Sequence, residues 1–560
     1  MGMGCIVEGL LAKRGLSGEA LEAFLDPSLK RLVKAADIPG LGDAADVIIP
    51  FVRNHRKIVV FGDYDCDGVC ASAILVMALT RLGASVQMFV PDRFAEGYGM
   101  TAASIGRLLF EHPDVALVVT VDCGITSAPE VKTLRERGVT VVVTDHHMPP
   151  ATLPECDALV DPKVPSQCDA AEALGVKDLC GAGVAFFLAS MLSARAVETG
   201  LYSGEKFGAP LLVLAGLATV VDIVPLRGQN RILVANALKA FRSAAPVGLM
   251  ELLHRAQRRP VDLTARDFGF LIGPRINAAG RMASAREAFL LLVETEREAA
   301  REHAFRVDTR NAERKTVENR MANEAIAQVD ELSPDAVVVN GSGGDPNWHS
   351  GVCGIVASRI VEKYGVPVAV AVDGRGSVRA PEGYDVHAAL TECAHVLERF
   401  GGHKAAGGFT VREGMFEDFR DAFKKVFAVQ CAGCGTKRDG GCIREPEMWI
   451  TPGDLTMELH GELSALAPFG EGNPEPVFGL KGVLFSDVKP MGENGRHASF
   501  SFSDRRIPRA TWWNHGCETE EIRSRSSFRF DITFTLDVSD WSCEEPRLEL
   551  RLREVCVSGP

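Results

Sequence analysis

Acidic residues and histidines follow several apolar runs of this sequence, at positions from which their side chains would meet. Four groups stand out: Asp63, Asp65 and Asp67 after KIVVFG; Asp122 after ALVVTV; Asp145, His146 and His147 after VTVVVT; and Asp222 after the run that begins at Pro210. Carboxylates gathered in one crevice repel one another, and divalent cations relieve that repulsion. Asp and His together suit Mn²⁺ or Mg²⁺, and the histidines favour Mn²⁺. One such group is equally well explained as a helix cap, whereas four groups together predict a metal centre.

The elements that must position these residues follow from the alternation of apolar strands with helical segments. The apolar runs at 57–62, 116–121, 139–144 and 157–160 are separated by stretches of helical pattern, such as 71–82 and 128–137. This alternation predicts an α/β fold with a parallel, doubly wound sheet. In such a sheet, ligands bind in the crevice beyond the carboxyl ends of the strands. All four groups, the one at Asp222 included, are expected at strand ends.

The chain has 560 residues, which is enough for three to four domains. Its pattern predicts, in order, an N-terminal helical segment (1–45), the α/β domain (46–283), a connecting segment of one long helix or two in series (284–330), a second α/β domain (331–428), a Cys- and Gly-rich linker (429–444) and a β-rich domain (445–560). The alternating pattern of the last domain predicts antiparallel strands that form a small barrel.

The composition excludes several classes of protein. With 46% hydrophobic and 24% charged residues, the chain is typical of globular domains and unlike disordered or fibrous proteins. Its longest apolar runs stay below the about 18 residues that span a bilayer, so no membrane role is expected. The 15 cysteines are scattered along the chain and odd in number, which favours reduced thiols in a cytoplasm.

Charge is unevenly distributed along the chain. The net charge of −13 argues against indiscriminate coating of nucleic acid. Between Arg227 and Arg286, however, eleven Lys and Arg residues stand against three acids, a local balance of +8. This basic stretch fits either a localised track for a polyanion or an ordinary solvated surface, and charge alone favours neither.

The motifs DYDCDG, VDCGI, TDHH and ATVVDIVP resemble the four signature motifs of the DHH phosphoesterase superfamily. Further segments, in order along nearly the whole chain, are similar to the RecJ family, the single-strand-specific DNA exonucleases of bacteria; among them are GPRINAAGRM, FGGHKAAGGFT and PFGEGNPEPVF. The resemblance implies a DHH domain and a DHHA1 α/β domain joined by the long helix, followed by an OB-fold domain that binds single strands.

The resemblance also implies a hydrolase that uses two divalent cations, Mn²⁺ or Mg²⁺. The residues of the four motifs would divide as follows: Asp65 and Asp122 hold one cation; Asp67, Asp122, His146 and Asp222 hold the other; His147 contacts the phosphate; and Asp63 and Asp145 orient ligands by hydrogen bonds. Asp122 would therefore bridge the two cations. Because two cations activate a bridging water, no covalent protein nucleophile is expected.

Contacts to the substrate are implied for a second set of residues. The set comprises Arg275 and Asn277 in a Gly-bounded loop, Arg281, Gly402 and His403 near the scissile phosphate, and a 5′-phosphate site of Ser377 and Arg379 with Arg93 and Arg275. Arg suits this task because its two N–H groups meet two phosphate oxygens at once. The loop also fits a plain turn between helices, and His349 fits either a substrate contact or a helix cap.

The implied function is a metal-dependent exonuclease that degrades single-stranded DNA in the 5′→3′ direction to 5′ mononucleotides, in DNA repair and recombination. The family implies a cytoplasmic enzyme, a monomeric state being compatible with the layout, with a single-strand-binding protein and a helicase as partners. Two alternatives stay open. One is a phosphodiesterase for short oligonucleotides or other small phosphoesters, against which the OB-like domain argues. The other is a non-catalytic scaffold, against which the complete set of acids and histidines argues.

Two local features of the C-terminal part, its aromatic residues and a cysteine cluster, allow more specific predictions. Phe500 and Phe502 share one strand face and are typical of a core, whereas Trp512 and Trp513 point to opposite faces, so at most one of the two is expected to be exposed. Cys431, Cys434 and Cys442 resemble part of a zinc site, but no fourth ligand stands nearby. A flexible linker that contains thiols is the expected interpretation.

Overall fold

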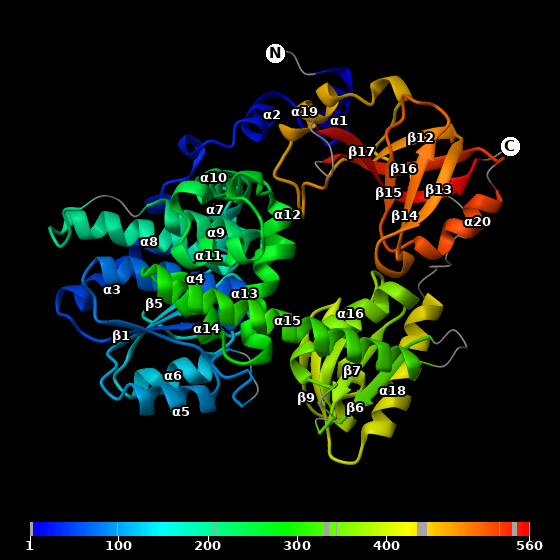
Figure 1. The fold of residues 1–560 in the computed structure, drawn as a ribbon. Coiled ribbons are helices and arrows are strands. Elements are labelled where there is room, and N and C mark those ends of the chain that lie inside the picture. The colour runs from blue at the N-terminus through cyan, green and yellow to red at the C-terminus, as the bar shows by residue number, and fades with distance from the viewer. Residues whose placement is uncertain are drawn as a thin grey trace.

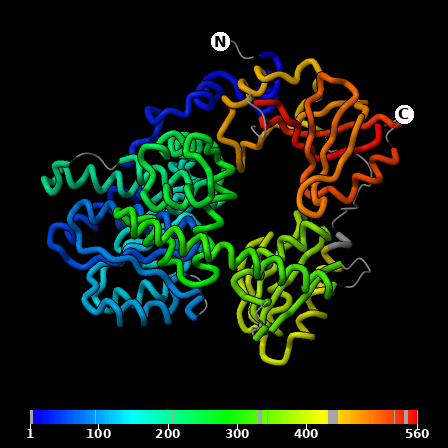
Figure 2. Tube along the Cα trace, in the orientation of Figure 1, coloured from blue at the N-terminus to red at the C-terminus, as the bar shows by residue number. Residues whose placement is uncertain are grey.

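Three sheets organise the part of the chain that the computed structural model describes, and each sheet has its own hydrophobic core (Figure 1). The described residues are 4–93, 95–97, 99–204, 208–329, 335–342, 344–345, 347–433, 445–525, 527–539 and 546–558. The three domains are arranged as an open ring, in which the N-terminal helices lie between the first domain and the last (Figures 1 and 2).

The first sheet consists of β1 (Ile58–Gly62), β2 (Val86–Phe89), β3 (Leu117–Val121), β4 (Thr140–Thr144) and β5 (Ala158–Val160). The strand order is β2-β1-β3-β4-β5 and every neighbouring pair is parallel, which confirms the predicted parallel sheet. All of β1 is buried, and its side chains divide between two clusters: Ile58 and Val60 pack on one face, Val59 and Phe61 on the other. A parallel sheet buried on both faces needs a layer of helices on each.

Different sets of helices form these two layers. One face is covered by α3 (Leu41–Arg53), α4 (Cys66–Arg81) and α8 (Gly181–Glu198), and the other by α5 (Ala102–Glu111) and α6 (Ala128–Glu136), with α7 (Pro165–Ala173) following β5. Helix α3 runs across the boundary expected between residues 45 and 46. By length and composition α8 alone among the described helices is apolar enough to cross a membrane, but 67% of it is buried inside the molecule, where it packs as a core helix.

A helical part of the first domain and the connecting segment follow the sheet. Their helices are α9 (Ala209–Val221), α10 (Gly228–Ala244), α11 (Val247–Arg255), α12 (Ala265–Asp267), α13 (Gly273–Met282), α14 (Ala285–Val293) and α15 (Arg297–Ala327). The connecting segment therefore contains two helices in series, the second of 31 residues.

The segment GPRINAAG was expected to be a Gly-bounded loop, and this expectation is wrong because the segment forms helix α13. Its glycines serve close packing instead of a turn. A Cβ on Gly273 would lie 2.4 Å from Val221 Cγ2, and a Cβ on Gly280 would lie 2.4 Å from the carbonyl oxygen of Tyr64. The glycines thus let α13 approach helix α9 and the loop that follows β1.

The second domain has a mixed sheet of β6 (Val337–Gly341), β7 (Val368–Val372), β8 (Arg375–Arg379), β9 (Leu397–Gly402) and β10 (Ala406–Val411), in the order β6-β7-β8-β10-β9. Only β6 and β7 pair in parallel among these neighbours. Its helices are α16 (Cys353–Tyr364), α17 (Val386–Glu392) and α18 (Phe416–Gly433). The cysteine cluster for which a flexible linker was expected in preference to a zinc site lies outside the described residues: Cys434 and Cys442 are not described, nor is the side chain of Cys431 at the end of α18.

The third domain has a seven-stranded sheet with two helices, α19 (Met457–Ser464) and α20 (Thr519–Ser524). Its strands are β11 (Met448–Trp449), β12 (Phe478–Val483), β13 (Phe485–Met491), β14 (His497–Phe502), β15 (Ala510–Trp512), β16 (Phe530–Ser539) and β17 (Arg547–Val557), in the order β11-β12-β16-β17-β15-β14-β13. Two pairs, β11·β12 and β15·β17, are parallel, so the sheet is not purely antiparallel as expected.

The aromatic side chains of the third domain agree with the expectations from sequence. Phe500 and Phe502 are buried in the core. Trp512 is buried as well, while Trp513 is 50% exposed, so one tryptophan of the pair faces solvent.

The N-terminal helices belong structurally to the third domain. Helix α1 (Cys5–Lys13) contributes Val7, Leu10 and Leu11 to the same core cluster as Leu459 and Leu463 of α19. Helix α2 (Gly18–Leu25) follows (Figure 1), and its Leu21, Phe24 and Leu25 pack against the same cluster. The first residues of the chain thus complete the core of its last domain.

Candidate metal centre and phosphate-binding site

The acidic residues of the first three motifs lie just beyond the carboxyl ends of neighbouring strands. Asp63 directly follows β1, and Asp122 directly follows β3. Asp65 is the N-cap of α4, where its Oδ1 accepts a hydrogen bond from the Gly68 N–H at 3.0 Å. The strand order reverses between β1 and β3, and a sheet of this kind binds its ligands at that switch point. The topology therefore places these carboxylates where a ligand site is expected.

Asp222 lies in the same cluster but comes from a helix and not from a strand, so its predicted position at a strand end is wrong. It is the C-cap of helix α9, whose apolar sequence the pattern could not distinguish from a buried strand. The carboxyl end of a helix carries partial negative charge, which disfavours a carboxylate there. Asp222 is therefore an additional destabilising charge that a nearby cation would offset.

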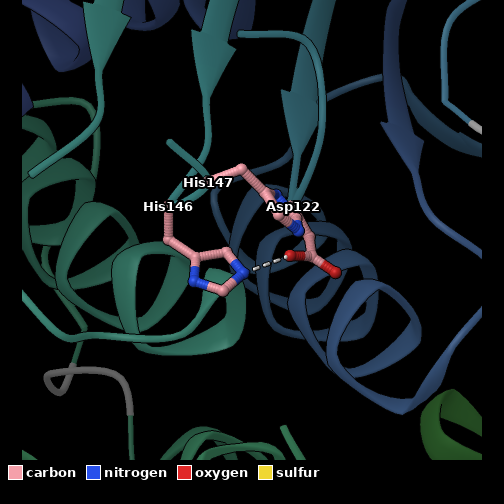
Figure 3. A group of neighbouring side chains, drawn as sticks. All are labelled: Asp122, His146 and His147. Carbon is pink, nitrogen blue, oxygen red and sulfur yellow. Dashed lines mark ion pairs between the residues drawn. The ribbon is translucent and has the colours of Figure 1, made fainter. Parts of the chain in front are cut away.

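His146 lies at the centre of the cluster, on the loop after β4. Its Nε2 is 3.0 Å from Asp122 Oδ1, 3.6 Å from Asp67 Oδ2 and 3.8 Å from Asp222 Oδ2. Figure 3 shows the ring pointing at the Asp122 carboxylate from the end of the neighbouring strand.

Within this cluster, three sets of side chains have ligand atoms that all lie within 4.8 Å of one another. The sets are Asp63, Asp65 and Asp122; Asp67, His146 and Asp222; and Asp122, His146 and His147. Asp122 belongs to two of these sets, which is the position that a ligand shared between two cations would occupy.

Two buried carboxylates hold the surroundings of the site in place. Both oxygens of Asp67 accept hydrogen bonds from the first turn of α8, at 2.6 Å from the Gly181 N–H and 2.7 Å from the Ala182 N–H. Asp145 Oδ2 accepts the Ile125 N–H at 2.9 Å, and its Oδ1 lies 2.7 Å from His147 Nδ1. Asp145 thereby fixes the orientation of the His147 ring.

The electrostatics of the cluster are those of a site built for cations. Burial, followed by the charges of Asp67, Asp65 and other acids, holds the pKa of Asp122 well above its usual range, and burial with Asp67 and Asp65 raises the pKa of Asp222 to about 8. Burial lowers the pKa of His146 to about 4, so its ring is neutral at pH 7 and able to donate a lone pair.

The neighbouring pair of His147 and Asp145 behaves differently. Burial alone would lower the pKa of His147, but the hydrogen bond and charge of Asp145 outweigh it and raise this pKa to about 9. Burial would likewise raise the pKa of Asp145, and the bond and charge of His147 instead leave it below its usual value.

The unsatisfied polar atoms test whether this residue set fits divalent cations. Asp63 Oδ1, Asp122 Oδ1 and both ring nitrogens of His146 are buried and have no hydrogen-bond partner among the described residues, even though His146 Nε2 and Asp122 Oδ1 are close. Buried polar atoms are normally satisfied, so these atoms require a partner that the chain does not supply. Carboxylate oxygens with a neutral imidazole are suitable ligands for Mn²⁺ or Mg²⁺, and the set fits such ions.

The backbone at Asp122 is strained, and a glycine permits the close packing around it. Asp122 has φ +61°, a conformation that non-glycine residues adopt rarely and that concentrates at functional sites. A Cβ on Gly181 would lie 2.5 Å from Asp122 Cβ and 2.7 Å from its Oδ1. The first residue of α8 must therefore be glycine for Asp122 to keep its place.

A second group of residues, on the DHHA1-like domain, surrounds the N-terminal end of α16. Arg379 and Ser377 lie on β8, and a Cβ on Gly354 in the first turn of α16 would be 2.9 Å from Arg379 Nη2 and 3.5 Å from Ser377 Oγ. The N-terminus of a helix carries partial positive charge, so a guanidinium and a hydroxyl beside it form a suitable site for an anion.

Several arginines near this group form no ion pair with the described carboxylates. No carboxylate of the described residues lies within ion-pair distance of Arg93, Arg281 or Arg379. Burial, then the charges of Arg93 and Arg314, lower the pKa of Arg281 to about 10, and burial with Arg93 lowers the pKa of Arg379. These arginines therefore lie close enough to repel one another, and an anion such as a phosphate would relieve the repulsion.

Two residues expected to contact the substrate instead have partners within the protein. Arg275 Nε pairs with Asp308 of α15 at 3.0 Å, and its Nη1 donates to the Leu271 carbonyl at 2.8 Å. Asn277 Oδ1 accepts the Cys66 N–H at 2.8 Å, which anchors the loop of the first motif to α13.

The structure does not bring the glycine–histidine segment after β9 into bonding contact with the acidic cluster. Gly402 and His403 are exposed, and no hydrogen bond or ion pair in the described part of the chain joins them to that cluster. His349 is an N-cap whose Nδ1 accepts the Gly351 N–H at 3.1 Å, in agreement with the capping alternative.

Sequence reasoning missed two residues beside the acids. Gly181 gave a signal in LCGAG, where two glycines open an apolar helix. Lys163, in VDPK after β5, adds a positive charge to the site: after burial, it contributes to the lowering of the His146 pKa. Its position three residues beyond a strand end was the signal that could have found it.

Comparison with known families assigns the class of the protein. Residues 57–215 match the DHH family, N-terminal domain; residues 334–429 match the DHHA1 domain; and residues 447–554 match the RecJ OB domain. The chain thus combines the DHH and DHHA1 domains of the DHH family with a RecJ OB domain.

Whole-chain relatives narrow the assignment. The single-stranded-DNA-specific exonuclease RecJ of Bacillus subtilis is 31% identical, over 99% of this chain and 68% of its own length; RecJ of Haemophilus influenzae is 35% identical, over 84% of this chain and 83% of its own. The crystal structure of RecJ from Thermus thermophilus in complex with Mn²⁺ matches with a TM-score of 0.79 and 30% identity, over 100% of this chain and 79% of that one; this RecJ has also been solved with Mg²⁺. The chain belongs to the RecJ family of single-stranded-DNA-specific exonucleases.

Proposed function

We propose that the protein hydrolyses single-stranded DNA from its 5′ end and releases 5′ mononucleotides, with two divalent cations held by its acidic cluster. The observation that carries the proposal is the set of buried, unsatisfied ligand atoms at the switch point of the DHH sheet. The RecJ relatives named as single-strand-specific exonucleases, and the RecJ structures with Mn²⁺ and Mg²⁺, support it.

The proposed ligands are those of the acidic cluster. Asp65 and Asp122 hold one cation, and Asp67, Asp122, His146 and Asp222 hold the other; Asp63 and Asp145 orient the ligands. When bound, such cations lower the pKa of a coordinated water and offset charge on the attacking and leaving oxygens. Asp145 turns His147 towards the phosphate, and the protonated ring donates a hydrogen bond to a phosphate oxygen.

The direction of degradation is proposed to come from recognition of a 5′ phosphate by Ser377 and Arg379 of β8, beside the first turn of α16, with Arg93 and Arg281 adding positive charge. Gly402 and His403 are proposed to contact the scissile phosphate. Arg275 and Asn277 serve the same substrate indirectly, through their contacts with Asp308 and with the backbone of Cys66.

The cellular setting is proposed from the family. A nuclease for single strands acts in DNA repair and recombination in the cytoplasm, where a helicase supplies single strands and a single-strand-binding protein coats them. We propose that the protein works as a monomer. The OB domain favours long strands as substrates over small phosphoesters, because a small substrate needs no strand-binding module.

The function is tested with single-stranded DNA that carries a 5′ phosphate and a label at either end, incubated with protein and Mn²⁺ beside a blunt duplex. Stepwise release of mononucleotides from the 5′ end, absent on the duplex and after chelation of the metal, is the expected result. Hydrolysis of dinucleotides with intact long strands would favour the small-substrate alternative. Binding of strands without any hydrolysis would favour the scaffold.

Replacing Arg379 by Met tests the 5′-phosphate site. The variant is expected to degrade a 5′-phosphorylated strand about 10- to 100-fold more slowly, because charge-assisted hydrogen bonds contribute about 1.5–3 kcal/mol. A strand with a 5′ hydroxyl should be affected far less, so that the preference for the phosphate shrinks. Competition between the two strands measures this preference directly.

Arg420→Met is the matched control, because Arg420 lies on α18 of the same domain, where it pairs with Glu417 and lies over the Phe416 ring. It should behave as wild type. An Arg379→Met protein that keeps the full preference for the 5′ phosphate would remove Arg379 from the proposed site.

A further inference from the structure

Arg231 on α10 is a buried arginine that the proposed chemistry does not use. Its exposed fraction is 2%, and no acidic residue of the described chain pairs with it. Its Nε donates to the Phe24 carbonyl at 2.9 Å, Nη2 to the Ala467 carbonyl at 2.8 Å and Nη1 to the Pro468 carbonyl at 3.4 Å. The guanidinium also lies 3.8 Å from the centre of the Phe24 ring. A charge buried without a counter-ion is costly unless its donors are all satisfied, so these contacts define one arrangement of the chain.

The partners of Arg231 come from segments far apart in the sequence. Phe24 lies on α2, while Ala467 directly precedes the PFGEGNPEPVF segment, which begins at Pro468 and leads from α19 into β12 of the OB domain. Arg231 itself lies on α10, in the helical part of the first domain. One guanidinium therefore joins the catalytic domain, the N-terminal helices and the OB domain.

One of the carbonyls that receive Arg231, that of Pro468, also accepts a hydrogen bond from Asn473 of the same segment. Its Nδ2 donates to the carbonyls of Leu466 at 2.9 Å and Pro468 at 2.8 Å, and its Oδ1 accepts Arg14 Nη1 at 2.8 Å. Asn473 is itself buried. Asn473 thus braces the turn of chain that carries two of the acceptors of Arg231.

Two further contacts join the same surfaces. The Leu226 N–H donates to the Glu471 carbonyl at 2.7 Å, and Arg227 Nε donates to the Gly472 carbonyl at 2.9 Å. The PFGEGNPEPVF segment therefore docks, through its backbone carbonyls, on the residues just before and within α10. We call this contact, made by residues 226–231 and 467–473, the OB joint.

We propose that Arg231 is the positioning residue of the OB joint. The joint holds the OB domain at a fixed place relative to the acidic cluster, so that a long strand bound to the OB domain reaches the catalytic site. The inference rests on the proposed function. Arg suits the position because its planar fork distributes its N–H donors over three nitrogens, each of which reaches a different carbonyl, whereas the three donors of Lys all leave one nitrogen.

The test compares wild type with Arg231→Met and Arg231→Lys on two 5′-phosphorylated substrates, a 40-nucleotide strand and a trinucleotide. For Arg231→Met, kcat/KM on the long strand should fall at least tenfold, mainly through KM, while the value for the trinucleotide stays within twofold. Small-angle X-ray scattering should give a larger radius of gyration for this variant. Arg231→Lys should lie between wild type and Arg231→Met in both measurements.

Arg242→Met is the matched control, because Arg242 is an exposed arginine on the same helix. It should match wild type in both measurements.

Equal losses on the two substrates with an unchanged radius of gyration would overturn the proposal, as would unchanged kinetics on the long strand. If Arg231→Met fails to fold by circular dichroism, Arg231→Lys decides: wild-type kinetics and radius of gyration in that variant overturn the proposal. A wild-type protein inactive on both substrates would refute the proposed function, and the radius of gyration would still test the joint.

Discussion

Replacing Asp122 by Asn is expected to lower kcat on single-stranded DNA by about 1,000-fold or more, a loss of about 4 kcal/mol of transition-state stabilisation. The Asp122 carboxylate belongs to two sets of candidate ligands, one with Asp63 and Asp65 and the other with His146 and His147. Its loss should therefore weaken the binding of both cations. Asn keeps the shape of the side chain and tolerates the positive φ at this position, so the loss reflects the charge and not a collapsed backbone. Single-turnover hydrolysis of an end-labelled strand measures the effect.

The same variant should be more stable than wild type when metal is absent. Burial, followed by the charges of its acidic neighbours, destabilises the Asp122 carboxylate and raises its pKa, and a neutral amide removes both penalties. Wild type should gain about 2.7 kcal/mol when Mn²⁺ is present at 100 times its dissociation constant, and the variant clearly less. Scanning calorimetry with and without Mn²⁺ gives both values.

Asp169→Asn provides the control, because Asp169 is an exposed acid on α7. It should change neither activity nor the stabilisation by Mn²⁺. Activity of Asp122→Asn within tenfold of wild type would show that this carboxylate is not a shared metal ligand.

Replacing Gly181 by Ala is expected to lower activity by about 100-fold, or about 2.7 kcal/mol, although the change adds one methyl group. The new Cβ would lie 2.5 Å from Asp122 Cβ, closer than such atoms approach in proteins. Neither side can give way easily: the Gly181 N–H is bonded to Asp67 Oδ2 at 2.6 Å, and Asp122 already has a strained backbone. The methyl group must therefore displace Asp122, Asp67 or both. Isothermal titration with Mn²⁺ should show weaker binding together with the loss of activity.

The control for this prediction is Gly106→Ala. Gly106 lies on the exposed side of α5, and a Cβ there would meet nothing within 4 Å. Since alanine favours a helix over glycine by about 1 kcal/mol, this protein should be as active as wild type and at least as stable. If Gly181→Ala also keeps wild-type activity and Mn²⁺ affinity, the close packing at α8 does not position Asp122.

The sequence alone determined the parallel sheet and most of the acidic cluster, because both are encoded locally. An apolar run of five or six residues between helical segments predicts a buried parallel strand. The residue after such a strand faces the ligand edge of the sheet, whatever the rest of the fold does. Asp63, Asp122 and His146 could therefore be assigned to one site from their positions along the chain, and the resemblance of their motifs to a known superfamily agreed with that assignment.

The sequence pattern failed where one local signal fits two structures. The apolar run before Asp222 has no clear period, so a buried helix could not be told from a buried strand. The glycines of GPRINAAG signalled a loop, yet they are needed for the close approach of α13 to Val221 and Tyr64. In both cases the deciding contacts come from other elements of the fold.

Only the tertiary structure decided how the domains are joined. In the sequence, Arg231 is one more positive charge within a basic stretch. No local signal shows that its guanidinium donates a hydrogen bond to the carbonyl of Ala467, 236 residues away. Nor does the sequence show that Leu10 and Leu11 of the first helix pack into the core of the last domain. Local propensity and period depend on neighbours within a few residues, whereas these contacts depend on which surfaces meet once every element has formed.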